Sequence, residues 1–189
     1  MISTNPIFSI SFKNRQIIAF YNHWICSFCL TENKVHFDDS LIVKKINYDN
    51  LDECNGQKDF YVGRMKGYLE NQSMYTEGFL FYKNDEPAGF VWVMYPGGNE
   101  FQYKVRKTDA FIFDVSVFEK FRGEGICGKM LSYLFNYLEI EKNAKEVKLA
   151  VRKNNVNAIR AYKKAGGVFV RSCRFFQIAR RFNIPYYIV

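Results

Sequence analysis

Residues 109–151 constrain the fold of this chain more than any other stretch. A strongly apolar run (109–118) leads into the loop RGEGICG (122–128), which holds three glycines within six residues. Apolar residues at helical spacing follow over 129–141, and a second apolar run occupies 147–151. This succession predicts two buried strands joined through a glycine loop and a helix, as in a right-handed strand–helix–strand crossover.

Alternating or apolar runs indicate further strands at 7–12, 78–83, 88–95, 168–176 and 185–189. The turn over 84–87 joins two of these strands into a hairpin, because Asn, Asp and Pro favour such turns. Residues 16–54 keep neither a helical nor a strand period, so no element is predicted there.

Two further helices are expected, one before the hairpin and one after the crossover. One is a short helix at 59–72. The other begins after 151, where Asn154 or Asn155 can cap it, and ends at Gly166 and Gly167. The order of elements predicts a mixed α/β sheet whose first half is antiparallel.

Length and composition describe one globular domain. At 189 residues, with no internal repeat or linker, two independent domains would be cramped. Apolar residues make up 48% and charged residues 24% of the chain, which excludes a disordered protein. The 19 Phe and 13 Tyr favour an aromatic core, although some of them could line a small-molecule pocket. No apolar stretch reaches the roughly 20 residues of a membrane span, and no secretory signal is visible, so we expect a cytoplasmic location without membrane contact.

The five cysteines, an odd number, do not suggest a disulfide framework. Cys26 and Cys29 form a C-x-x-C pair, which would suit redox chemistry or half of a zinc site. Zinc would need two further ligands, and His23, His36 and Cys54 make an irregular set. Two buried, reduced thiols are therefore favoured, and no metal is expected.

The net charge of +8 is unevenly distributed along the chain. Residues 101–189 hold 18 Lys and Arg against 7 Asp and Glu, whereas residues 1–100 hold 9 against 12. An anionic ligand is therefore expected in the second half. A cofactor that contains a polyphosphate fits this asymmetry. Nucleic acid is not expected, because no aromatic and basic module such as an RNP signature is present.

The glycine loop satisfies the G-x-G-x-x-G pattern of dinucleotide-binding turns, but its context does not fit. The next strand runs into two basic residues instead of the acidic residue that binds a ribose. Lys129 is followed by Met130, so the loop is not a P-loop either. A purely structural turn would need only one glycine. Three glycines before a helix leave several N–H groups bare at the positive end of its dipole, which favours an anion cradle.

Residues 117–131 resemble the coenzyme A-binding motif of the GNAT superfamily of acetyl-CoA-dependent N-acyltransferases. The family pattern is Arg/Gln-x-x-Gly-x-Gly/Ala after a strand that ends in Val, and Arg122 and Gly125 match it. Cys127 departs from the last position, with Gly128 one residue later. A second segment, 151–166, is similar to the strand and helix that follow in this family.

This resemblance implies a GNAT-like fold over a single domain, 1–189. Its mixed, mostly antiparallel central sheet would be flanked by helices, with a V-shaped splay between strands 109–118 and 147–151. Residues 78–170 would form the cofactor-binding core, and residues 1–77 a divergent segment on the acceptor side.

The resemblance also implies acetyl-CoA as co-substrate. The loop amides would hold its pyrophosphate, and the backbone of Val115 and Val117 would pair with the pantetheine arm. The Val117 amide would polarise the thioester carbonyl, and Asn155 would bind the cofactor or a bridging water besides capping its helix. The expected cofactor-binding residues are Val115, Val117, Arg122, Gly123, Glu124, Gly125, Ile126, Cys127, Gly128, Lys129 and Asn155.

Two residues are expected to take part in catalysis. By its place in the second motif, Tyr162 is the candidate general acid, because a phenol with a pKa of about 10 suits a departing thiolate of comparable basicity. The alternative is a core residue on an apolar helix face. Asp114, which strand alternation places with Ser116 on one face, is the candidate general base or a sheet anchor. Glu77 and Glu119 are rival bases.

The function expected from this resemblance is transfer of an acetyl group from acetyl-CoA to the primary amine of a small molecule, such as an amino sugar or amino acid, by direct attack. The alternatives are a non-catalytic coenzyme A-binding or regulatory module, or an acyltransferase for longer acyl chains or protein N-termini. The protein is expected to be a monomer or a homodimer.

Overall fold

The computed structural model describes residues 8–12, 15–30, 40–55, 59–71, 74–100, 103–178 and 182–185. The chain forms two compact units. The larger unit is Phe28–Lys148, and the smaller unit combines Met1–Ser27 with Leu149–Val189. The boundary interrupts two strands, β2 (Arg15–Cys29) and β9 (Glu146–Arg152).

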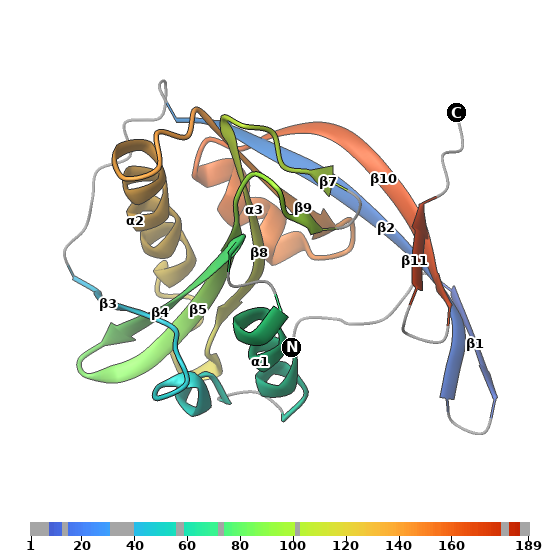
Figure 1. The fold of residues 1–189 in the computed structure, drawn as a ribbon, viewed down its shortest axis with the longest axis horizontal. Helices are drawn as coiled ribbons and strands as arrows, with labels where there is room; N and C mark the ends of the chain where they lie inside the picture. The colour runs from blue at the N-terminus through green and yellow to red at the C-terminus, as the bar shows by residue number, and fades with distance from the viewer. Residues whose placement is uncertain are drawn as a thin grey trace. The chain divides into compact units, whose positions relative to one another are not determined.

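The larger unit is built on an antiparallel sheet (Figure 1). Its strands are β3 (Ile42–Lys45), β4 (Thr76–Lys83), β5 (Glu86–Met94), β8 (Asp109–Val117) and the short pair β6 (Asn99–Glu100) and β7 (Tyr103–Lys104). Its helical segments are η1 (Leu51–Asn55), α1 (Asp59–Asn71), η2 (Glu119–Phe121) and α2 (Ile126–Ile140). The main sheet runs in the order β9–β8–β5–β4–β3, and the pairings from β8 to β3 are antiparallel.

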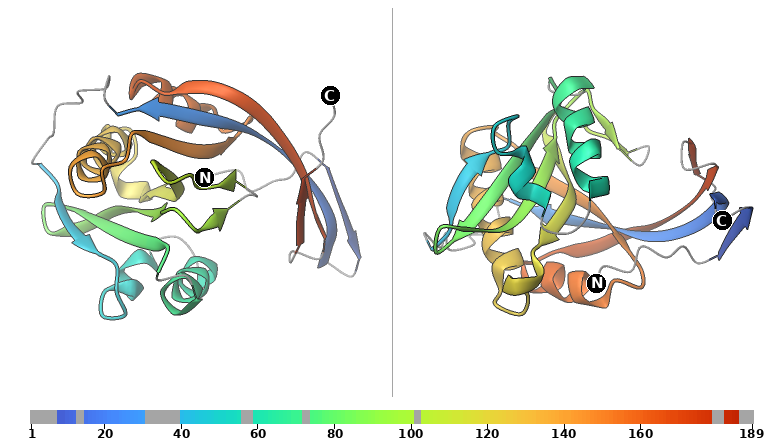
Figure 2. Two further views of the ribbon diagram at one scale, coloured as in Figure 1. Left: turned by 45° about the horizontal axis from the view of Figure 1, so that its top comes forward. Right: turned by 90° about the horizontal axis from the view of Figure 1, so that it is seen from below.

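Helices cover both faces of this sheet. In Figure 2, α2 lies over one face of β4 and β5, and α1 and η1 lie over the other. Side chains agree with this arrangement, because the ring of Tyr68 in α1 lies 5.1 Å from that of Trp92, whereas Tyr137 in α2 lies 5.1 Å from Phe79. The buried rings between these layers confirm the predicted aromatic core; they include Phe79, Phe81, Phe90, Trp92 and Phe111.

The predicted hairpin is present, but its turn is shorter than expected. Lys83 pairs directly with Glu86, so the connection is the two-residue loop of Asn84 and Asp85. Both residues have positive φ angles, 50° and 61°, which is the conformation of a two-residue hairpin turn. Pro87 was expected in the turn but lies in β5, at a register shift that removes the need for its N–H.

The smaller unit is a second antiparallel arrangement of strands with one helix. Its strands are β1 (Phe8–Phe12), β2, β10 (Val168–Ile178) and β11 (Phe182–Pro185), with α3 (Val156–Lys164). The order is β11–β10–β2–β9, with β1 paired to β2. The strands predicted at 7–12 and 168–176 are therefore confirmed, whereas most of the strand predicted at 185–189 lies outside the described residues.

The predicted fold class is confirmed. β8 and β9 are neighbours in the sheet and are joined through α2, a helical crossover of the kind that parallel strands require. The pairings β1–β2, β2–β10, β10–β11, β3–β4, β4–β5 and β5–β8 are antiparallel, so the sheet is mixed and mostly antiparallel. None of the helices in the described part of the chain is long and apolar enough to cross a membrane.

Candidate functional site

The glycine loop links β8 to α2. Gly123 and Gly125 have φ angles of 87° and 76°, in the left-handed region that favours glycine. Gly125 is the N-cap of α2, so the helix begins at Ile126 and not at the predicted Lys129. A Cβ atom placed on Gly123, Gly125 or Gly128 would meet no atom within 4 Å. The space beside this backbone is therefore open.

The first turn of α2 presents backbone donors to this open space. The Lys129 N–H bonds to the Gly125 carbonyl at 3.2 Å, and it is the first amide to close the helix. Among the described residues, the N–H groups of Ile126, Cys127 and Gly128 have no acceptor, and no side chain caps the helix. Unpaired amides at the positive end of a helix dipole suit a phosphate group, so the loop fits the pyrophosphate of coenzyme A.

Charged side chains of the loop are held by neighbouring groups. Glu124 would repel a phosphate, but Lys83 of β4 forms an ion pair with its carboxylate. The Arg122 Nε donates to the Val117 carbonyl at 3.3 Å, and its Nη1 lies 3.8 Å from the Glu119 Oε1. Both Glu124 and Arg122 are therefore partly neutralised by a partner of opposite charge, and Lys129 adds a further cation at the start of α2.

Cys127, the departure from the family pattern, is half-buried in the first turn of α2. Burial raises the pKa of its thiol to about 11. The side chain is therefore a neutral thiol at physiological pH, and it adds no negative charge beside the proposed phosphate position.

Asp114 lies at a β-bulge in β8. Phe90 pairs with Ser116 and Trp92 with Phe113, so β8 holds one extra residue between these pairs. Asp114 has a φ of 47°, a left-handed conformation that Asp tolerates better than most residues. The predicted alternation is therefore wrong at this point, because strict period two does not continue through a bulge. Asp114 is half-exposed while Ser116 is buried.

The smaller unit carries the two remaining predicted residues on α3. Tyr162 is buried, with 6% of its surface exposed. Asn155, and not Asn154, is the N-cap, because its Oδ1 accepts a hydrogen bond from the Ala158 N–H at 3.2 Å. This confirms the structural part of the prediction for Asn155. Its role toward a cofactor, and that of Tyr162 in proton transfer, stay predictions.

Residues 43–167, more than half of the chain, match the model of the acetyltransferase (GNAT) family. The chain belongs to the GNAT family. It is therefore an N-acetyltransferase by class, and acetyl-CoA is the acyl donor that this family uses.

Individual relatives agree with this assignment. A spermine/spermidine N(1)-acetyltransferase of Bacillus subtilis (strain 168) is 27% identical over 143 residues, which cover 74% of this chain and 76% of that protein. A functionally unknown conserved protein from Staphylococcus epidermidis has a TM-score of 0.62 at 16% identity, over 84% of this chain and 61% of its own. A tandem GNAT protein from the clavulanic acid biosynthesis pathway has a TM-score of 0.61 at 13% identity, over 85% of this chain and 54% of its own. This chain spans less than two thirds of these two structures, and the likeness shows the GNAT fold.

Glu77, a rival candidate for the general base, accepts several hydrogen bonds on the α2 side of the GNAT sheet. The hydroxyls of Tyr95 and Tyr137 donate to its Oε2 at 2.5 and 2.9 Å, and Lys45 and Lys142 donate to its Oε1 at 3.0 and 3.3 Å. Burial alone would raise the pKa of Glu77, but these hydrogen bonds and the charge of Lys142 lower it to about 2. A carboxylate that stays ionised and accepts four donors is a poor general base.

The lowered pKa of Glu77 predicts acid sensitivity. Its folded-state pKa of about 2 lies below the ordinary value of 4.5, so its contribution is present above pH 4.5 and is lost as pH falls toward 2. Between pH 6 and pH 3 we expect the free energy of unfolding to lose roughly 1–2 kcal/mol through this group, given its partial exposure.

Urea unfolding of Glu77→Gln and of Glu70→Gln, a surface control with an exposed lysine partner, measures this contribution. The stability gap between the wild type and Glu77→Gln should narrow as pH falls, whereas Glu70→Gln should follow the wild type. A gap that stays constant from pH 6 to pH 3 would contradict the assigned pKa.

The cysteine prediction is half right. Cys26 and Cys29 both carry reduced thiols, and Cys26 is buried, but Cys29 is exposed. Positions three apart in a strand lie on opposite faces, which separates the two thiols of the C-x-x-C pair. Among the described residues there is no group of three or more His, Cys, Asp or Glu side chains that could hold a metal ion. His36 lies outside those residues.

Sequence patterns missed two contacts around the site. The ion pair of Lys83 with Glu124 and the hydrogen bond of Tyr68 with Asp114 each join residues more than 40 positions apart. No local period or motif connects such positions. The first contact needs β4 and the loop after β8 to come together, and the second needs α1 to pack against β8.

Proposed function

We propose that this GNAT protein transfers the acetyl group of acetyl-CoA to the primary amine of a small molecule. The observation that carries the proposal is the open, donor-lined loop at the start of α2, where glycines with positive φ leave backbone amides uncovered. When bound, acetyl-CoA supplies the thioester whose acetyl group is transferred. Amino sugars and amino acids are the proposed acceptor classes, and the B. subtilis relative adds polyamines to the compounds worth testing.

The charge distribution restricts where a cationic acceptor could meet a carboxylate side chain. All 19 acidic residues lie between residues 28 and 148, so the segments 1–27 and 149–189 carry only positive charge. A protonated amine can therefore find a carboxylate only in the larger unit. Asp114, half-exposed at the bulge of β8, is our candidate for this role.

Each proposed residue has a defined chemical task. The amides of the glycine loop bind phosphate, and the Val117 N–H donates to the developing oxyanion. Asp114 accepts a proton from the acceptor ammonium, directly or through water, which leaves the neutral amine that attacks the thioester. As the amide forms, the nitrogen loses its second proton, which replaces the phenolic proton that Tyr162 donates to the departing sulfur. The bulge supports this role of Asp114, because β-bulges near active sites change the direction in which a strand side chain points.

Titration calorimetry with coenzyme A tests the cofactor part of the proposal. We expect saturable binding to the folded protein at one site per chain. A folded protein that shows no heat of binding with coenzyme A would overturn the proposal. Binding without turnover of any amine would favour the non-catalytic module instead.

Replacing Tyr162 by phenylalanine tests the general acid. Because the substitution removes only the hydroxyl, we expect kcat to fall roughly 100-fold while the affinity for coenzyme A stays within twofold. Tyr48→Phe is the matched control, since Tyr48 is 58% exposed and outside the proposed site. Steady-state kinetics by thiol release measures both variants, and an unchanged kcat in Tyr162→Phe across pH would remove this residue from the mechanism.

A further inference from the structure

A tyrosine on α1 contacts the carboxylate that we assign to the acceptor. The Tyr68 hydroxyl donates a hydrogen bond to the Asp114 Oδ2 at 2.9 Å. The two residues are 46 positions apart, and they come from a helix and from the bulge of a central strand. This contact therefore exists only because α1 packs on the face of the sheet where Asp114 emerges.

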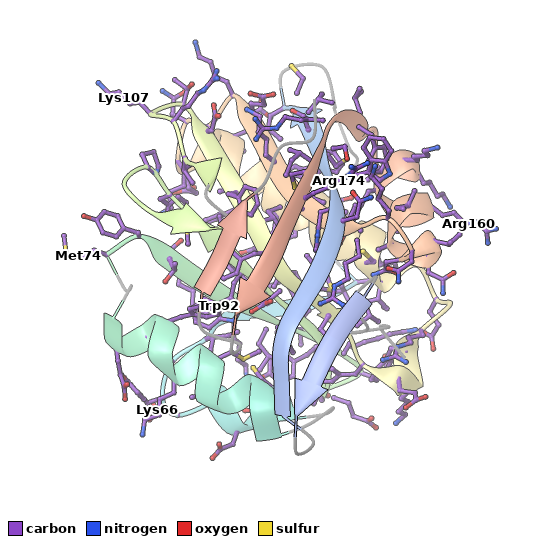
Figure 3. All side chains as sticks on the ribbon, turned by 90° about the vertical axis from the view of Figure 1, so that its right-hand side faces the viewer. Lys66, Met74, Trp92, Lys107, Arg160 and Arg174 are labelled. Carbon is purple, nitrogen blue, oxygen red and sulfur yellow. The ribbon has the colours of Figure 1, made fainter. Side chains whose placement is uncertain are left out.

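The ring of Tyr68 is held rigidly. It lies 5.1 Å from the ring of Trp92 and 5.1 Å, edge to face, from that of Phe113, and only 6% of the residue is exposed. Trp92 itself is fully buried. In Figure 3, Trp92 lies inside the molecule, whereas Lys66 on the same helix as Tyr68 points outward. A ring packed in this way has little freedom to move its hydroxyl away from the carboxylate.

A base at a bulge needs such support. The extra residue in β8 removes the regular strand neighbours that would otherwise fix the direction of the Asp114 side chain. A hydrogen bond to Oδ2 fixes the plane of the carboxylate, in which Oδ1 also lies. Positioning to within a fraction of an ångström is what proton transfer from the acceptor amine to a carboxylate requires.

We propose that Tyr68 is a positioning residue, which holds the Asp114 carboxylate in the orientation that receives the proton of a cationic acceptor amine. The inference rests on the proposed function, because it takes Asp114 as the base for the acceptor amine. It assigns Tyr68 no contact with acetyl-CoA. Tyr68 acts only through Asp114. Removal of its hydroxyl therefore changes kcat/KM for the amine and leaves coenzyme A binding unchanged.

A double-mutant cycle separates this role from a structural one. Tyr68→Phe keeps the packed ring and removes the hydroxyl, and Asp114→Asn removes the charge while keeping a residue that tolerates the left-handed conformation. We expect kcat/KM for the amine to fall roughly tenfold in Tyr68→Phe and roughly 100-fold in Asp114→Asn. The double variant should match Asp114→Asn, because no carboxylate is left to position.

Tyr82→Phe is the matched control, since the Tyr82 hydroxyl bonds to the Glu53 carboxylate at 2.8 Å in the same way. This variant should lose a similar amount of thermal stability and keep the wild-type kcat/KM. An equal loss of kcat/KM in Tyr82→Phe, a multiplicative loss in the double variant, or full activity in Tyr68→Phe would each overturn the inference. A wild-type protein that turns over no amine would instead overturn the proposed function.

Discussion

Replacing Gly125 by valine should weaken coenzyme A binding roughly 100-fold while the protein stays folded. Gly125 has a φ of 76° and is the N-cap of α2. A β-branched residue is strongly disfavoured in this left-handed conformation. Its side chain would also enter the space beside the loop that is open in the structure. Backbone strain in the glycine loop and steric exclusion of a phosphate both lower the affinity for coenzyme A.

Gly63→Val is the matched control for this substitution. Gly63 lies on the exposed surface of α1, where a Cβ atom also meets nothing within 4 Å, but its backbone is helical. Valine there should leave coenzyme A affinity unchanged and stability equal or slightly higher. Calorimetry on both variants, with circular dichroism to confirm folding, gives the comparison. A folded Gly125→Val protein with wild-type affinity would contradict the loop as the pyrophosphate site.

Replacing Lys148 by methionine should destabilise the protein by about 3–5 kcal/mol. Lys148 of β9 is 8% exposed, and its Nζ donates to the buried Asp109 Oδ2 at 2.9 Å and forms an ion pair with Glu146. Methionine fills a similar volume but leaves the Asp109 carboxylate buried without its cation. The cost of an uncompensated buried charge dominates the change.

A second substitution should recover much of this loss. Lys148→Met combined with Asp109→Asn removes both charges, so the double variant should regain more than half of the lost stability. Lys66→Met is the surface control, because the exposed Lys66 lies 3.8 Å from Glu70, and it should change stability by less than about 0.5 kcal/mol. Urea unfolding of the three variants measures these differences. Equal losses in Lys148→Met and in the double variant would show that packing, and not charge, sets the cost.

The central part of the fold could be predicted because its determinants are local. The apolar run of β8, the glycines and the amphipathic pattern of α2 each act within a few residues of the chain. The helix start was misplaced by three residues, because Gly125 caps α2 with its backbone conformation and without any side chain that a pattern could recognise.

The rest of the site depends on partners that a single strand does not reveal. The bulge at Asp114 appears only when β8 is paired with β5. The partners of Glu77 come from β3, α2 and the segments that follow β5 and α2, and together they turn a candidate base into a structural anion. The long strand β2 gave no clear period, because residues at 25–28 are buried on both faces.

The proposed acetyl transfer is tested by the release of free thiol from acetyl-CoA, measured across a panel of amino sugars, amino acids and polyamines. We expect thiol release that saturates with at least one small primary amine, together with the N-acetylated product in the mass spectrum of the same reaction. A folded protein that binds coenzyme A but releases no thiol with any amine of the panel would contradict it.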